Sequence, residues 1–178
     1  TNIAVFYPHH KGRIQHILIP LGGGPHSRLA LRLAYEVAEE ENARVIVFRE
    51  APENTDDEEL EDAALFLQEI VNQELGLMPA RITIHTARSG SVTDAVLEET
   101  GHQKYDLLVM GASEEYGLGT RLFGSVDDWI IEHVRDCSVL LVRQHESVMI
   151  HWIRRYLKKL WKEYQLIPNG NNPSNHLS

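Results

Sequence analysis

The feature that most restricts the fold is a short apolar run that ends in glycine and passes directly into a helical pattern. Residues 15–21 (QHILIPL) form a continuous apolar run, typical of a strand buried on both faces. Three glycines at 22–24 break this run, and apolar residues then recur at helical spacing over 25–41. Because parallel strands need crossover connections, a buried strand followed by an amphipathic helix predicts a parallel sheet.

The same alternation continues along the chain. Further strands are predicted at 44–48, 81–86, 105–110 and 138–142. Further helices are predicted at 60–75, at 94–100 with Gly101 as the cap, and at 124–134. The pattern therefore predicts one Rossmann-like α/β domain over residues 14–147, with a five-stranded parallel sheet and helices on both faces.

Both ends of the chain lie outside this pattern. Residues 1–13 contain an apolar run at 3–7 that Pro8 stops, and we interpret it either as an edge strand or as the tail of a linker. Residues 148–164 are predicted to form an amphipathic helix with basic and aromatic side chains. Residues 165–178 are polar, and we expect a flexible tail there.

Three interpretations of the basic helix at 148–164 stay open. It packs on its own domain or on a dimer partner, it lies on an anionic membrane surface, or it docks on another protein. We favour the first, because aromatic and aliphatic residues recur on one side of the predicted helix.

Composition restricts the compartment and the partners. The formal net charge is −9, so the body of the protein should repel nucleic acid and anionic membrane. Cys137 is the single cysteine, which excludes an intrachain disulfide and fits a reducing, cytoplasmic compartment. No apolar stretch approaches the ~20 residues of a membrane span, and no signal peptide is visible.

Two loops carry the functional expectations, since ligands of such sheets bind at the carboxyl ends of the strands near the topological switch point. The glycines at 22–24 either let a ligand approach the backbone or simply form a tight turn. They match neither a P-loop nor the dinucleotide fingerprint. The segment 110–126 (MGASEEYGLGTRLFGSV) ends at a predicted helix start, where Ser125 would hold a phosphate. Together the two loops predict a mononucleotide cleft.

Across residues 14–143 the chain resembles the universal stress protein (UspA) family. ATP-binding members of that family carry a Gly-x2-Gly-x9-Gly-Ser/Thr motif after the fourth strand. Gly111, Gly124 and Ser125 match this motif, between YDLLVMGAS and GSVDDWIIEHV. The resemblance implies a nucleotide-binding regulatory domain for ATP or AMP with Mg, or for a cyclic dinucleotide. The site residues that it implies are Pro20, Leu21, Gly22, Arg49, Met110, Gly111, Ala112, Glu114, Gly124, Ser125 and Val126.

Two positions depart from the family pattern. Glu114 stands at the second glycine of the motif, where its carboxylate would oppose a phosphate. Gly22 stands where binding members have an acidic residue after the first strand of the domain. An altered ligand preference is therefore one expectation, and a ligand-free dimerisation scaffold is the alternative.

Catalysis is not expected. The ten histidines show no metal-ligand spacing, and no nucleophile, base and orienting residue occur together. A slow ATPase using the same cleft remains the enzyme alternative. Among the histidines, His26 is singled out by its place beside the first glycine loop.

The expected role is a regulatory domain that passes its nucleotide occupancy to a partner. We expect a homodimer through the fifth predicted strand. The predicted basic helix and the sequence of residues 22–34 (GGGPHSRLALRLA) resemble those of domains attached to membrane transporters. We therefore expect a transporter upstream of Thr1 and a position at the cytoplasmic face of the membrane.

Overall fold

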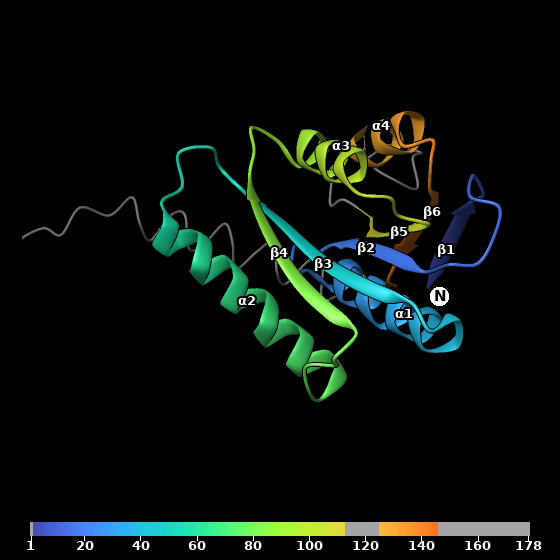
Figure 1. The fold of residues 1–178 in the computed structure, drawn as a ribbon, viewed down its shortest axis with the longest axis horizontal. Helices are drawn as coiled ribbons and strands as arrows, with labels where there is room; N and C mark the ends of the chain where they lie inside the picture. Colours follow the sequence, from blue (N-terminus) through green and yellow to red (C-terminus); the bar gives the residue numbers. More distant parts are fainter. Residues whose placement is uncertain (1, 113–124, 146–178) are drawn as a thin grey trace, which may run out of the picture. The chain divides into compact units, whose positions relative to one another are not determined.

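The computed structural model describes residues 2–112 and 125–145, which form a sheet with helices against both faces (Figure 1). The strands are β1 (Ile3–Tyr7), β2 (His16–Pro20), β3 (Arg44–Ala51), β4 (Ile82–Arg88), β5 (Leu107–Gly111) and β6 (Ser138–Arg143). The helices are α1 (Pro25–Glu41), α2 (Asp57–Leu75), α3 (Val92–His102) and α4 (Ser125–His133). The predicted α/β class is confirmed. The predicted helix at 148–164 and the tail at 165–178 lie outside the described residues.

The sheet has six strands in the order β1-β6-β5-β2-β3-β4, where five had been expected. Strands β2 to β6 pair in parallel, as predicted, whereas β1 pairs antiparallel with β6. The apolar run at 3–7 is thus an edge strand, and the sheet is mixed. The sequence left this open because an isolated five-residue run does not specify its partner. The backbone N–H groups of His9 and His10 also donate to Ser138 Oγ, which anchors the segment after β1.

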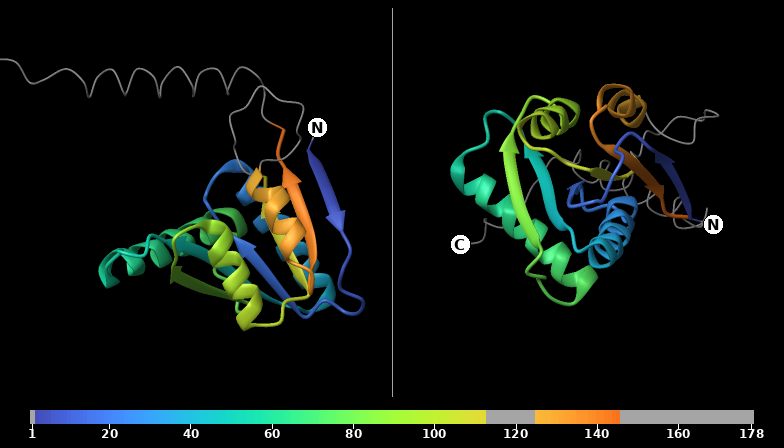
Figure 2. Two further views of the ribbon diagram at one scale, coloured as in Figure 1. Left: turned by 90° about the horizontal axis from the view of Figure 1, so that it is seen from above. Right: turned by 45° about the vertical axis from the view of Figure 1, so that its right-hand side comes forward.

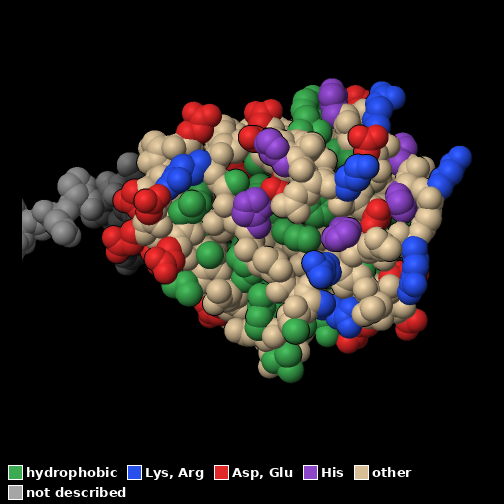
Figure 3. Space-filling model, in the orientation of Figure 1, with side chains coloured by type: hydrophobic (Ala, Val, Ile, Leu, Met, Phe, Trp, Pro, Cys, Tyr) green, Lys and Arg blue, Asp and Glu red, His purple; other side chains and the backbone are tan. Residues whose placement is uncertain are grey.

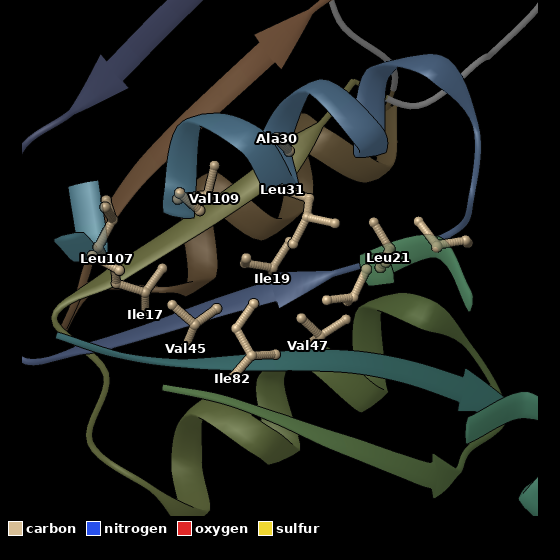
Figure 4. Packing of buried hydrophobic residues seen from close by; sticks show 14 of the residues in the cluster. Ile17, Ile19, Leu21, Ala30, Leu31, Val45, Val47, Ile82, Leu107 and Val109 are labelled. Carbon is tan, nitrogen blue, oxygen red and sulfur yellow. The ribbon is translucent and has the colours of Figure 1, made fainter. Parts of the chain in front are cut away.

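Alternation along the strands divides the core into two layers. One layer lies under each of the two groups of helices that Figures 1 and 2 show on the faces of the sheet. On one face, Ile17, Ile19 and Val47 pack under α1 and α2, in the cluster that Figure 4 shows. On the other face, Leu18 and Phe48 pack under α3 and α4. Because successive side chains of a strand point to opposite faces, a continuous apolar run fills both layers. The structure therefore explains why QHILIPL does not alternate with polar residues.

Strand β3 is longer than predicted and reaches Ala51 instead of ending at Phe48. Its register with β4 runs from Val45 opposite Ile82 to Ala51 opposite Arg88. Pairing along this whole length makes residues 49–51 part of the sheet although they are not uniformly apolar. The extension carries Arg49 and Glu50 to the carboxyl edge of the sheet.

Helix caps account for most of the boundaries. Asp56 accepts the N–H of Glu59 at the start of α2, which ends at Gly76 with φ of +79°. The predicted cap at Gly101 was wrong, since α3 continues through His102. Gly101 has no left-handed backbone, and one glycine in a last helical turn costs at most about 1 kcal/mol.

Charge is unevenly distributed over the surface (Figure 3). Acidic side chains gather over the start of α2, whose first turn contains Asp57, Glu58 and Glu59. Lys, Arg and His side chains lie mainly on the opposite side of the view. Within residues 2–112 and 125–145, no helix combines the length and the apolarity that crossing a membrane requires.

Candidate functional site

A cavity of about 350 Å³ opens at the carboxyl ends of β2, β3 and β5, and we call it the switch-point cleft. It lies where the strand order reverses, because β2 leads through α1 to β3 on one side while β5 pairs on the other. Its walls come from the glycine loop, the ends of the three strands and the starts of α1, α3 and α4. The lining residues are Pro20, Leu21, Gly22, Gly24, Pro25, His26, Ser27, Phe48, Arg49, Glu50, Val92, Met110, Gly111, Ala112, Val126 and Asp127.

The cleft gathers most of the site residues that the sequence predicted. Eight of them line it, from four separate parts of the chain: Pro20, Leu21, Gly22, Arg49, Met110, Gly111, Ala112 and Val126. Glu114 and Gly124 lie outside the described residues. Ser125 is the first residue of α4, and its side chain is not among those described.

Two arginines hold the glycine loop. Arg28 Nε donates to the carbonyl oxygen of Gly23 at 3.0 Å, and Arg49 Nη1 donates to that of Gly22 at 3.4 Å. Gly23 has φ of +87°, which a side chain would strain, whereas Gly22 and Gly24 do not have positive φ. Gly24 is the N-cap of α1 and has no side chain that could accept the backbone N–H groups of the first turn. The first turn of α1 also contains no acidic residue, so no carboxylate of its own opposes an anion there.

Gly111 has a packing role as well as its place in the motif. A Cβ atom at this position would lie 2.3 Å from the backbone nitrogen of Ser27 and 2.4 Å from the carbonyl carbon of His26. The end of β5 and the first turn of α1 therefore touch backbone to backbone. Only glycine permits this approach, which brings the two walls of the cleft together.

His26 lines the cleft and also joins two elements of the fold. Its side chain is buried, and its Nδ1 accepts the backbone N–H of Gln144 at 3.1 Å. An accepting Nδ1 carries no proton, so the imidazole is neutral when this bond forms. The contact ties the residue that follows β6 to the first turn of α1.

The sequence did not identify every wall of the cleft. Val92 begins α3, and Asp127 lies in the first turn of α4, where its side chain is almost completely buried. The acidic pair in GSVDDW was the available signal for Asp127. The signal for Val92 was weaker, namely its position just after the end of a predicted strand.

Outside the cleft, residues 2–112 and 125–145 also contain a buried thiol, Cys137, and a second cavity. Burial, assisted by Asp136 and Asp106, raises the pKa of the Cys137 thiol to about 12, so it is a protonated and unreactive core group at neutral pH. Among the described residues, no three His, Cys, Asp or Glu side chains are grouped to hold a metal ion. A cavity of about 790 Å³ at the amino ends of β5 and β6 contains none of the predicted site residues.

Comparison with known proteins agrees with this geometry. The family model described as "Universal stress protein family" matches residues 13–143. No curated protein matches the sequence at a significant level.

Solved structures resemble about three quarters of the chain. A universal stress protein UspA from Lactobacillus plantarum has a TM-score of 0.59 at 18% identity, over 75% of this chain and 100% of that one. A universal stress protein in complex with cAMP has a TM-score of 0.60 at 22% identity, over 74% and 98%. The universal stress protein from Archaeoglobus fulgidus in complex with dAMP has a TM-score of 0.52 at 18% identity, over 72% and 97%. The fold, the cleft and the match over residues 13–143 together show that this chain belongs to the universal stress protein family.

Proposed function

We propose that the switch-point cleft binds an adenine nucleotide or a related signalling nucleotide and that its occupancy regulates a partner. The observation that carries the proposal is the convergence of Gly22, Arg49 and Gly111 with the start of α4 around one cavity. The cavity volume of about 350 Å³ lies at the lower end of the range for small-molecule sites.

The relatives support this ligand class. One similar universal stress protein was crystallised with cAMP and another with dAMP. Both are mononucleotides with an adenine base, which the cleft has the volume to hold. We extend the proposal to AMP, to ATP with Mg and to a cyclic dinucleotide. The proposed regulation needs no covalent chemistry. A nucleotide that binds one conformation of the domain more tightly than another shifts the population toward that conformation by binding alone.

Signalling through a partner is the second part of the proposal. The proposed partners are a second copy of the chain and an attached membrane transporter, which would place the domain at the cytoplasmic face of the membrane. A homodimer through β6 is restricted by the strands that already pair with it. Strand β6 pairs with β5 on one edge and with β1 of the same chain on the other. Two copies therefore meet at this edge only through the outer side of β1, or after β1 has moved away.

Thermal unfolding with and without nucleotide tests the proposal. A ligand at ~100 times its Kd should add about 2.7 kcal/mol to the free energy of unfolding. The panel is AMP, ATP, cAMP and a cyclic dinucleotide, each with and without Mg²⁺. We expect at least one of them to raise the melting temperature by several degrees.

A blocked cleft provides the control. A Cβ atom on Gly22 would meet nothing within 4 Å, so Gly22→Leu fills the cleft without a clash at its base. Gly101→Leu is the matched variant, because Gly101 has equally open surroundings and does not line the cleft. The shift should disappear in Gly22→Leu and persist in Gly101→Leu. No shift with any nucleotide would instead favour a ligand-free scaffold.

A further inference from the structure

Arg49 stands in the switch-point cleft without an ion-pair partner among the described residues. It is half-buried near the carboxyl end of β3. Its Nη1 donates to the carbonyl oxygen of Gly22, at 3.4 Å. Other arginines of the described chain pair with carboxylates, namely Arg13, Arg28, Arg32 and Arg88. Arg49 is also the only Lys or Arg among the described residues that line the cleft.

The ring of Phe66 holds this guanidinium in place. The Cζ atom of Arg49 lies 4.7 Å from the ring centroid, within the range of a cation–π contact. The tip of the Phe66 ring lies against the glycine loop, since a Cβ atom on Gly23 would lie 2.8 Å from Phe66 Cζ, while 39% of the residue is exposed. A side chain that is already ordered loses less conformational entropy when it binds. Arg49 is therefore a positioned cation.

There is room for a ligand beside the guanidinium. The space in front of Gly22 is open, since no atom lies within 4 Å of a Cβ built there. Arginine presents five N–H donors in a planar fork that matches two oxygens of a phosphate. The contact with Gly22 uses one of these donors, at a long distance.

Arg49 and the start of α4 belong to different walls of the cleft. Strand β2 separates β3 from β5, so the ends of β3 and β5 are two strand spacings apart, about 10 Å. The chain passes from β5 to α4, which packs on the face of the sheet that also carries α3. Arg49 is directed instead toward Phe66 of α2, on the other face. Because the two groups leave the sheet toward opposite faces, the cleft offers separate positions for two anionic groups.

We propose that Arg49, positioned by Phe66, recognises an anionic group of the ligand that is separate from a phosphate at the start of α4. This inference rests on the proposed function and refines its ligand class. The preferred ligand is a nucleotide with two phosphates that are not adjacent. The second phosphate belongs either to a substituted ribose or to the second phosphodiester of a dinucleotide.

Isothermal titration calorimetry with four ligands tests the inference: adenosine, AMP, adenosine 3′,5′-bisphosphate and cyclic di-AMP. In the unaltered chain, the bisphosphate or the cyclic dinucleotide should bind about ten- to a hundredfold more tightly than AMP. Whichever of the two has this advantage identifies the source of the second phosphate. Arg49→Gln should abolish the advantage, so that the bisphosphate and the cyclic dinucleotide bind no more tightly than AMP.

The matched control is Arg44→Gln, which removes the same charge at the opposite end of β3 and should keep the advantage. Phe66→Leu should reduce the advantage without weakening AMP binding, and Phe66→Tyr, which retains a ring, should restore it. Arg49→Lys, which keeps the charge but not the planar fork, should retain only part of it.

Two results would overturn the inference: equal affinities for AMP and both bisphosphorylated ligands, or an advantage that survives Arg49→Gln. A different result would contradict the proposed function itself. If neither adenosine nor any of the three phosphorylated ligands binds, the cleft is not a nucleotide site, and the inference falls with it.

Discussion

At the residue scale, a buried carboxylate links α3 to the sheet. Glu99 is 5% exposed, its Oε1 accepts the hydroxyl of Tyr105, and its Oε2 lies 3.0 Å from Nδ1 of His85. Burial and then the bond to Glu99 raise the pKa of Tyr105, so the phenol remains a donor at all moderate pH values. A buried acceptor with two donors is stabilising only while both bonds are kept.

Removing one donor should therefore be costly. We expect Tyr105→Phe to lower the free energy of unfolding by about 1–3 kcal/mol, because a buried acceptor would lose one of its two partners. Urea denaturation of Tyr105→Phe, Glu99→Gln and the double variant measures the coupling between the two residues. A loss below ~0.5 kcal/mol in Tyr105→Phe would contradict this role.

The sequence predicted individual site residues best where the backbone geometry allows only one residue type. The spacing of Gly111 within the motif and its place after an apolar run were visible in the sequence, and the structure adds its contact with Ser27 and His26. The sequence could not show that Phe66 contacts Arg49, because this contact joins α2 to β3, two elements that meet only in the folded chain. Such a pair depends on tertiary packing, which periodicity does not encode.

At the element scale, α1 and α2 are joined by an ion-pair cluster around Glu74. Arg28 Nη1 lies 2.9 Å from Glu74 Oε1, Arg32 pairs with the other carboxylate oxygen, and 15% of the Glu74 side chain is exposed. Burial alone would raise the pKa of Glu74, but the hydrogen bonds from the two arginines outweigh it and lower the pKa. The cluster thus favours the charged carboxylate in the folded state.

The sign of the pH effect follows from this lowered pKa. The contribution of Glu74 to stability is present above its unfolded-state pKa near 4.5 and is lost as the pH falls through the lower folded-state value. We expect the loss of stability on acidification below pH 4.5 to be smaller in Glu74→Gln than in the unaltered chain. Urea melts at several pH values measure it, with exposed Glu40→Gln as the control. Equal acid sensitivity in Glu74→Gln and the unaltered chain would count against the cluster.

Prediction was also uneven at the element scale. The helix at 25–41 was predicted with its observed bounds, because Pro25 marks its start and apolar residues recur along it. The extension of β3 to Ala51 and the strand at 3–7 depend on pairing partners that are distant in the sequence. Hydrophobic periodicity therefore predicts the bounds of a helix well, because the buried side of the helix produces the pattern. It predicts the bounds of a strand poorly where pairing with a neighbouring strand determines them.

At the scale of the whole molecule, β1 covers an edge that the parallel sheet would otherwise expose. Five residue pairs join β1 to β6, from Ile3 opposite Arg143 to Tyr7 opposite Val139. Ile3 and Phe6 are exposed, and residues 3–7 contain no charge or proline that would protect an edge. If β1 is displaced, the backbone of β6 becomes available to a second copy.

Proline substitutions in β1 test this role. Amide groups alternate in direction along a strand, so one of Ala4→Pro and Val5→Pro removes a bond to β6 while the other faces outward. We expect one variant to self-associate and the other to serve as its matched control, as measured by light scattering after size exclusion. Hydrogen exchange at Leu140 and Leu141 reports whether β1 has detached. A detached β1 with an unchanged mass would contradict the role of β6 in association.

The central claim is that the switch-point cleft is a nucleotide site, and amide chemical-shift mapping tests it most directly. The labelled chain is titrated with AMP and followed by two-dimensional NMR. We predict that the largest shifts occur at Leu21, Gly22, Glu50 and Ala112, while residues 101–104 at the opposite end of the sheet stay unchanged. Shifts confined to residues 101–104, or none at millimolar AMP, would contradict the assignment of the cleft.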